Sequence, residues 1–175
     1  MRYAAFLRAV NLGRNRRVTS ARLKSLFEEA GAEEVATFRT SGNVVFEAPR
    51  DIARALEKHL ERELGHEVVI FLRTAKELKE IATHEPFPPQ QVEASKGKLQ
   101  VSLLDKKPAA ATRKKVLALA TEQDPLAFGE RELYWLPSGG TMESELDRQA
   151  IDKLLGPTTM RTKGTVELLA AKFFD

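Results

Sequence analysis

Hydrophobic positions in the first half of the chain fall into short runs and alternating stretches that predict four strands. Residues 3–7 are apolar without interruption, which is typical of a central strand buried on both faces. Residues 35–39 and 44–47 flank Ser41-Gly42-Asn43, and this combination predicts a hairpin because glycine and asparagine tolerate positive φ. Residues 68–72 are β-branched and aromatic, as expected for a fourth strand.

Between these strands the apolar residues change to helical spacing. The first such stretch predicts a helix that Thr19 or Ser20 caps and Gly31 ends. The second predicts a helix that begins after Asp51 and ends at Gly65. Both helices lie between predicted strands, so the spacing indicates that each packs one apolar face on a sheet.

Thr74 and Glu77 have the spacing of a capping box, which predicts one further helix after the fourth strand. The resulting order is β-α-β-β-α-β followed by a helix. This order is the split βαβ arrangement of ferredoxin-like folds.

The same order is predicted again in the second half, after a segment at 85–98 that contains Pro86, Pro88 and Pro89 and is interpreted as a linker. In the helix expected at 109–120, Val116 and Leu117 are predicted to face inward. The remaining elements are strands at 99–104, 126–128, 133–136 and 158–161, a helix capped by Ser144, and a final helix that begins at Thr165.

The predicted fold is therefore α+β, with two tandem ferredoxin-like subdomains whose sheets are antiparallel. The first subdomain with its extra helix is expected at 1–84, the linker at 85–98, and the second subdomain with its extra helix at 99–175.

Composition is that of a globular protein, with 42% hydrophobic and 30% charged residues. No apolar run approaches the roughly 20 residues of a membrane span, so no membrane partner is expected. The chain has no cysteine, which excludes disulfides, thiolate metal sites and a cysteine nucleophile, and the expected compartment is the cytoplasm. The three histidines lack metal-ligand spacing, so no metal or other cofactor is predicted.

The net charge of +3 arises in the first part of the chain. Residues 1–80 hold 15 basic and 12 acidic side chains, whereas residues 81–175 hold 13 of each. Arg14, Arg16 and Arg17 alone account for the excess. This distribution favours a local anion-attracting patch over a generally basic protein that coats nucleic acid.

The segment from Asn11 to Arg17 joins the first strand to a helix N-terminus, where unpaired N–H groups and the helix dipole favour an anion. Gly13 allows close approach of the backbone, and arginines nearby bind phosphate in a bidentate manner. The segment is neither a Walker A loop nor a GxGxxG fingerprint. The alternative is an ordinary exposed connection. The hypothesised ligand-binding residues are Arg8, Asn11, Gly13, Arg14, Arg16, Arg17, Arg39, Ser41, Gly42 and Asn43.

Three further features have a functional and a structural interpretation. Arg8 shares a strand face with Ala4 and Phe6, so it is expected to be half buried, either tying down the loop or contacting a ligand. Arg161, Lys163 and Thr165 form a second candidate anion patch, for which the alternative is a helix cap with surface charge. Tyr134 and Trp135 lie on opposite strand faces, where one ring is a candidate for stacking on a base or a ligand. For Trp135 a place in the core or at the interface between the subdomains is favoured.

Three short motifs resemble the signature of an uncharacterised bacterial family, domain of unknown function 1697. Arg8, Asn11 and Gly13 match an Arg-x-x-Asn-x-Gly pattern, and residues 41–46 match a Ser-Gly-Asn-Val-Val-Phe hairpin. Arg161 and Thr165 match a C-terminal motif in which Thr162 replaces an asparagine, and Arg14 stands where a second glycine is frequent. The resemblance implies paired α+β subdomains. It implies no catalytic residue, because the family has no established activity.

The function expected from these features is binding of a small phosphorylated or otherwise anionic ligand, such as a nucleotide, at the first strand-to-helix loop. Three alternatives remain. They are a nucleic-acid-binding module, an enzyme acting on a phosphorylated metabolite, and a structural or dimerisation protein. No nucleophile elbow or other catalytic motif occurs, so no catalytic residue is assigned. No run of aromatic residues and glycines typical of RNA-recognition sheets occurs either.

Overall fold

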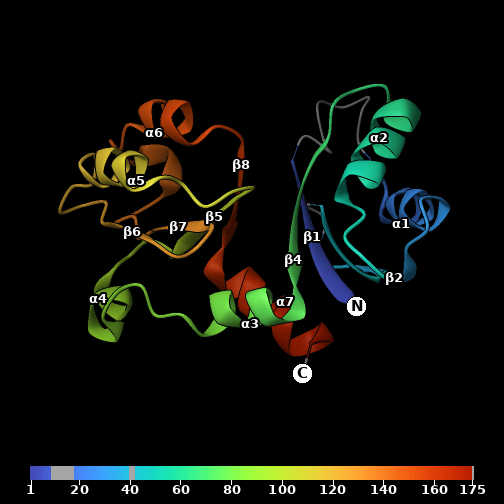
Figure 1. Cartoon of the computed structure of the whole chain (residues 1–175). Helices are drawn as coiled ribbons and strands as arrows, with labels where there is room; N and C mark the ends of the chain where they lie inside the picture. Colours follow the sequence, from blue (N-terminus) through green and yellow to red (C-terminus); the bar gives the residue numbers. More distant parts are fainter. Residues whose placement is uncertain (9–17, 40–41, 175) are drawn as a thin grey trace. The chain divides into compact units, whose positions relative to one another are not determined.

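The structure is a computed structural model that describes residues 1–8, 18–39 and 42–174. The chain divides into two compact units, one comprising Met1–Lys79 with Lys172–Asp175 and the other Glu80–Ala171 (Figure 1). The division falls inside two helices, α3 (Ala75–Thr83) and α7 (Lys163–Phe173). It therefore lies a few residues before the 84/85 boundary that the sequence pattern predicts.

The first unit contains a four-stranded antiparallel sheet in the order β2-β3-β1-β4. The strands are β1 (Arg2–Arg8), β2 (Glu33–Thr37), β3 (Asn43–Glu47) and β4 (Val69–Thr74). This is the ferredoxin-like order, and it confirms the prediction that residues 3–7 form a central strand. Ala4, Ala5 and Phe6 are fully buried, so β1 is covered on both faces.

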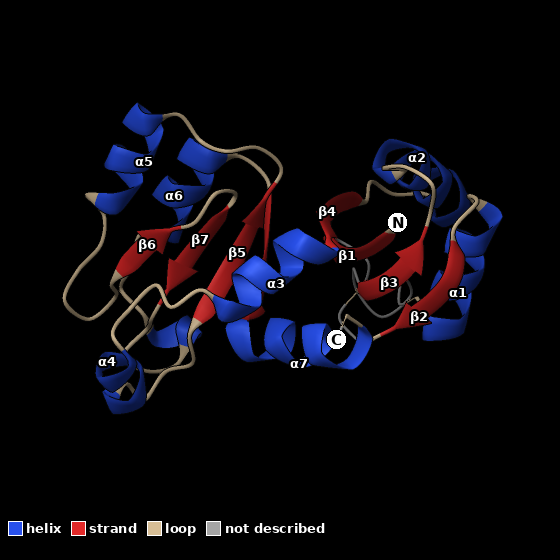
Figure 2. Ribbon diagram, turned by 60° about the horizontal axis from the view of Figure 1, so that its bottom comes forward, coloured by secondary structure: helices blue, strands red, loops and turns tan. Residues whose placement is uncertain are grey.

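One face of this sheet carries the core of the first unit. It is covered by α1 (Ser20–Glu29) and α2 (Ala53–Leu64), as Figure 2 shows. Leu26, Phe27 and Leu56 are buried against the sheet at the helical spacing seen in the sequence. The Phe27 and Tyr3 rings both pack on Phe46, edge-on and stacked respectively. Burial is also the main reason why the pKa of Tyr3 is raised, with the carboxylates of Asp51 and Glu77 adding to the effect.

The ends of the helices are fixed by the residues that the sequence singles out. Thr19 caps α1, and its Oγ1 accepts from the Arg22 N–H at 3.1 Å. Gly65 ends α2 in the left-handed conformation. Before α3, the Thr74 N–H donates to Glu77 and the Glu77 N–H donates to Thr74 Oγ1, at 2.8 and 3.2 Å. This reciprocal pair confirms the predicted capping box.

The last residues of α7 belong to the first unit. The Phe173 ring packs edge-on against Phe38 with centroids 6.1 Å apart, and the Arg2 guanidinium lies 5.7 Å from the centroid of Phe174. The end of the chain thus packs against residues at the start of β1 and just after β2.

The second unit repeats the topology with the strand order β6-β7-β5-β8, also antiparallel. Its strands are β5 (Gln100–Leu104), β6 (Leu126–Phe128), β7 (Glu132–Trp135) and β8 (Thr158–Thr162). Its other helices are α4 (Pro89–Ala94), α5 (Ala110–Leu117), the short 3-10 helix η2 (Thr141–Glu143) and α6 (Arg148–Leu155). Two four-stranded sheets with helices in the split βαβ pattern confirm the predicted fold class.

Trp135 lies in the core between this sheet, α5 and α6, as the sequence favours. Its indole N–H donates to Asp124 Oδ1 at 2.9 Å, and the Ser144 hydroxyl donates to the same oxygen at 2.7 Å. Asp124 is buried, and these two donors satisfy part of its hydrogen-bonding capacity. Ser144 therefore does not cap α6, contrary to prediction. Asp147 does, by accepting from the Ala150 N–H at 3.1 Å.

Two other local predictions for the second half need correction. Leu117 is 41% exposed because α5 ends at this residue, while Val116 is fully buried as expected. The predicted linker at 85–98 contains α4, a helix that starts with Pro89 at a position where proline is tolerated. Within the part of the chain that the structure describes, no helix is long and apolar enough to cross a membrane.

Candidate functional site

The C-terminal end of β1 lies beside the loop that joins β2 and β3. The Leu7 N–H donates to the Gly42 carbonyl at 2.9 Å, directly after the Phe6–Asn43 pair of the β1–β3 ladder. In the split βαβ strand order the end of the first strand lies opposite the start of the third, and Leu7 and Gly42 have this arrangement. Arg8, at which the basic segment 8–17 begins, therefore directly follows the residue that contacts the β2–β3 loop.

Arg8 is the last residue of β1 and pairs with Val69 of β4. Its side chain is exposed rather than half buried, so that expectation is wrong. The strand ends at this residue, and the apolar cover over Ala4 and Phe6 does not extend to it. Arg8 therefore places a guanidinium group on the exposed surface of the first unit, at the end of β1.

The β2–β3 loop is closed by Asn43. The Phe38 N–H donates to the Asn43 carbonyl at 2.9 Å, and the Asn43 side-chain amide donates to the Phe38 carbonyl at 3.0 Å. Gly42 has a φ of 74°, which confirms the predicted positive φ in the turn. Asn43 itself is only 1% exposed. The amide of this candidate ligand-binding residue is therefore used to shape the loop.

Arg39 is the exposed cation of this loop. It has a φ of 60°, which is uncommon for a residue other than glycine, and its Cζ lies 5.5 Å from the centroid of the Phe38 ring. The loop thus holds Arg39 in a left-handed conformation of the kind that often marks functional positions.

The remaining candidate residues of the first site lie outside the described residues. These are Asn11, Gly13, Arg14, Arg16, Arg17 and Ser41. The structure describes the elements that flank them, which are the end of β1, the Thr19 cap of α1 and Gly42.

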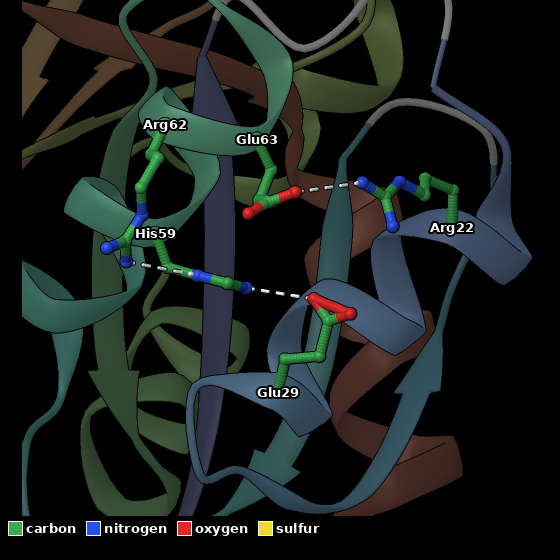
Figure 3. A network of polar contacts seen from close by, with 5 residues as sticks. All are labelled: Arg22, Glu29, His59, Arg62 and Glu63. Atoms are coloured by element: carbon green, nitrogen blue, oxygen red, sulfur yellow. Dashed lines mark hydrogen bonds and ion pairs between the residues drawn. The ribbon is translucent and has the colours of Figure 1, made fainter.

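Polar contacts join α1 to α2 on the outside of the first unit (Figure 3). Arg22 in the first turn of α1 pairs with Glu63 at 3.4 Å, and Glu29 at the end of α1 contacts His59 Nε2 at 2.9 Å. Arg62 reaches His59 Nδ1 at 3.4 Å. Two of these contacts, Arg22–Glu63 and Glu29–His59, cross from α1 to α2, and surface contacts of this kind contribute about 0–1 kcal/mol each.

The second candidate patch lies where β8 passes into α7. Thr165 donates its N–H to Thr162 Oγ1 at 3.2 Å, so Thr162 caps the first turn of the helix. Lys163 is buried, and its ammonium group donates to the Ala82 carbonyl at 3.0 Å and contacts Glu167 at 3.5 Å. The ammonium group is thus engaged by acceptors within the second unit.

Arg161 in this patch is half-buried. Its guanidinium donates to Thr159 Oγ1 at 2.7 Å and to the Met160 carbonyl at 2.9 Å. Burial lowers the pKa of Arg161 to about 10, so the side chain remains charged at neutral pH. An anion at this patch stays a prediction.

A surface cleft of about 330 Å³ lies in the second unit, and its lining includes Tyr134, one of the two aromatic residues considered for stacking on a ligand. Its lining comes from α3, α5 and the β6–β7 hairpin, and it mixes charged and aromatic side chains: Glu80, Ile81, His84, Arg113, Phe128, Gly129, Glu130, Glu132 and Tyr134. Across the described ranges 1–8, 18–39 and 42–174, no cluster of three or more histidine and acidic residues has the geometry of a metal site.

These features define a tandem ferredoxin-like α+β protein with a basic region at the end of its first strand. The chain belongs to a family described as "Protein of unknown function (DUF1697)", whose model matches residues 1–134. A comparison with curated proteins finds no match.

Among solved structures, the chain is similar to conserved bacterial protein SP0830 from Streptococcus pneumoniae. The identity is 17%, the TM-score is 0.71, and the alignment covers 99% of this chain and 98% of the other. At this identity the similarity shows the fold alone, and it extends over both units.

Proposed function

We propose that the protein binds a small phosphorylated or otherwise anionic ligand at the C-terminal end of β1. The observation that carries the proposal is the hydrogen bond from the Leu7 N–H to the Gly42 carbonyl. It brings the start of the basic segment 8–17 to the same end of the sheet as the loop that holds Arg39. The end of β1 and the β2–β3 loop, which are distant in sequence and each carry an arginine, thus lie side by side.

The residue types at this place suit a phosphate group. A guanidinium group donates two parallel N–H bonds to phosphate oxygens and keeps its charge throughout the physiological pH range. The segment contains Arg14, Arg16 and Arg17 and leads into the N-terminus of α1, where the helix dipole favours negative charge. Arg8, the first residue of this segment, and Arg39 in the β2–β3 loop are both exposed.

The proposal is limited to binding. Arginine, glycine and asparagine supply hydrogen-bond donors and positive charge, but at neutral pH none of them provides the nucleophile or the general base that a reaction requires. The modest net charge of +3, concentrated in the first part of the chain, favours a small ligand over a long nucleic acid.

The proposal is tested by thermal unfolding with inorganic pyrophosphate as the probe. Pyrophosphate at about 100 times its Kd is expected to stabilise the wild type by roughly 2.7 kcal/mol, which raises the Tm. The variant Arg14→Ala/Arg16→Ala/Arg17→Ala should show no such rise. The matched control Lys106→Ala/Lys114→Ala/Lys115→Ala removes the same charge from exposed positions of the second unit and should respond as the wild type does.

Two results would contradict the proposal. One is an equal rise in Tm for the wild type and the segment variant, which would place the bound anion elsewhere. The other is no rise in the wild type for pyrophosphate, nucleotides or sugar phosphates, which would leave the segment as a solvated surface.

A further inference from the structure

The floor of the cleft in the second unit lies on the face of β7 opposite to the core under α5 and α6, and Arg113 of α5 reaches the rim. Glu132 and Tyr134 of β7 alternate with Leu133 and Trp135, which belong to the core under those helices. Glu132 and Tyr134 therefore lie on the opposite face and line the cleft. Both are less than 10% exposed, so they form its floor.

Gly129 in the β6–β7 turn keeps this floor accessible. A Cβ atom at Gly129 would lie 3.1 Å from Glu132 Oε1 and 3.2 Å from Tyr134 Cε2, tighter than ordinary contact. The absence of a side chain at this position thus leaves space above the carboxylate and the phenol ring. A carboxylate has about four acceptor positions, so Glu132 can accept from the Arg131 N–H and from a ligand together.

Negative charge predominates in the lining. Three carboxylates, those of Glu80, Glu130 and Glu132, face one guanidinium, that of Arg113. Lys107 pairs with Glu130 at 3.3 Å and offsets one of the carboxylates. The Arg113 guanidinium stacks on the Phe128 ring, with its Cζ 5.3 Å from the centroid. The lining with its neighbour Lys107 therefore carries three carboxylates against two cationic groups, and this excess of negative charge favours a cation.

The walls provide apolar and aromatic surface for the body of a ligand. The His84 and Tyr134 rings lie 5.1 Å apart at 46°, and Ile81 of α3 contributes aliphatic surface. A volume of about 330 Å³ is at the lower end of the range for small-molecule sites and suits a ligand with a single ring. A protonated amine beside aromatic rings and carboxylates gains both ionic and cation–π attraction.

We infer that this cleft binds a small organic cation, a primary amine with an aromatic or aliphatic body, whose ammonium group lies between the carboxylates of Glu80 and Glu132. The inference concerns the second unit alone and is independent of the proposed anion site at the end of β1.

The test is a titration of the full chain with three probes of the same shape, benzylamine, benzyl alcohol and benzoate, followed by amide NMR resonances. Benzylamine should shift the amides of Gly129, Glu132 and Tyr134, and it should bind at least tenfold more tightly than the neutral and the anionic probe. Benzoate binding as tightly as benzylamine, or no binding of benzylamine at millimolar concentrations, would overturn the inference.

Variants at the two carboxylates separate the site from a general charge effect. Glu80→Gln lies on an exposed helix position and should weaken benzylamine binding about tenfold without affecting the fold, because it removes one charge-assisted bond. Glu132→Gln should do the same from the floor of the cleft. The matched control Glu122→Gln removes an exposed carboxylate outside the lining and should leave the affinity unchanged. Equal affinity of all three variants and the wild type would place the amine elsewhere and overturn the inference.

Discussion

Asn43 acts twice in closing the β2–β3 loop, since its carbonyl accepts from Phe38 and its side-chain amide donates back to Phe38. The side chain of a shorter or apolar residue would leave the Phe38 carbonyl without this donor. Gly42 precedes Asn43 and has a positive φ, which glycine adopts without strain. In this conformation the Gly42 carbonyl accepts from the Leu7 N–H and continues the pairing of β1 with β3. These contacts thereby connect Phe38 to Asn43 across the β2–β3 loop and connect Gly42 to the end of β1.

Replacing Gly42 with valine should therefore destabilise the first unit. A β-branched residue is strained at a φ of 74°, and the expected loss is on the order of 1–3 kcal/mol in the free energy of unfolding. Urea denaturation of Gly42→Val and of Gly164→Val makes the comparison. At Gly164 φ is ordinary and a Cβ would meet no atom within 4 Å, so that variant should remain close to the wild type. Equal stability of the two variants would contradict the turn geometry.

At the scale of single residues, the residue type predicts the backbone conformation more reliably than it predicts the solvent exposure of the side chain. Gly42, Gly65 and the Thr74–Glu77 pair could be assigned from sequence because their local backbone chemistry is nearly independent of the rest of the chain. Exposure depends on where an element ends. Arg8 is exposed because β1 ends with it, whereas Arg73, just beyond the predicted strand 68–72, is 1% exposed because β4 extends to Thr74.

Among the elements, the starts of the helices are determined by small polar side chains. Thr19 and Asp147 accept from the first turn of α1 and α6, and Asp51 accepts from the Ala53 N–H at the start of α2. The sequence pattern predicts Ser144 as the cap of α6, although aspartate, the residue type of Asp147, is equally favoured at N-caps. Asp124, twenty residues earlier, accepts the hydrogen bond of the Ser144 hydroxyl and so keeps Ser144 from capping the helix. A long-range contact of this kind leaves no local signal, and neither does the short helix α4 within the proline-containing segment.

The cap of α7 gives a prediction for the position at which this chain departs from the family motif. Thr162→Ala should lower the free energy of unfolding by about 0.5–2 kcal/mol, because the Thr165 N–H loses its acceptor. Thr162→Asn should be nearly neutral, since asparagine caps as well as threonine does. Thr112→Ala in α5 serves as the control and is expected to be neutral. A loss for Thr162→Asn as large as that for Thr162→Ala would show that Thr162 contributes through packing and not through the cap.

At the scale of the whole molecule, both halves of the chain form a four-stranded antiparallel sheet with the same strand order. The element order alone predicts this, because the split βαβ connection allows few ways to bury the apolar face of each helix. The candidate sites are less predictable. The basic segment stands out in the sequence, but the cleft in the second unit combines residues from 80 to 134, and only the fold brings them together.

The central claim is that an anion binds where β1 ends, and mapping the bound probe on the chain tests it most directly. In an amide NMR titration of the wild type with inorganic pyrophosphate, the largest shifts among the described residues should fall on Leu7, Arg8, Arg39 and Gly42. These shifts should diminish as salt is raised, because the contacts are ionic. Shifts confined to residues 80–171, or shifts of the same size at residues 7–8 and 42 in the Arg14→Ala/Arg16→Ala/Arg17→Ala variant, would contradict the claim.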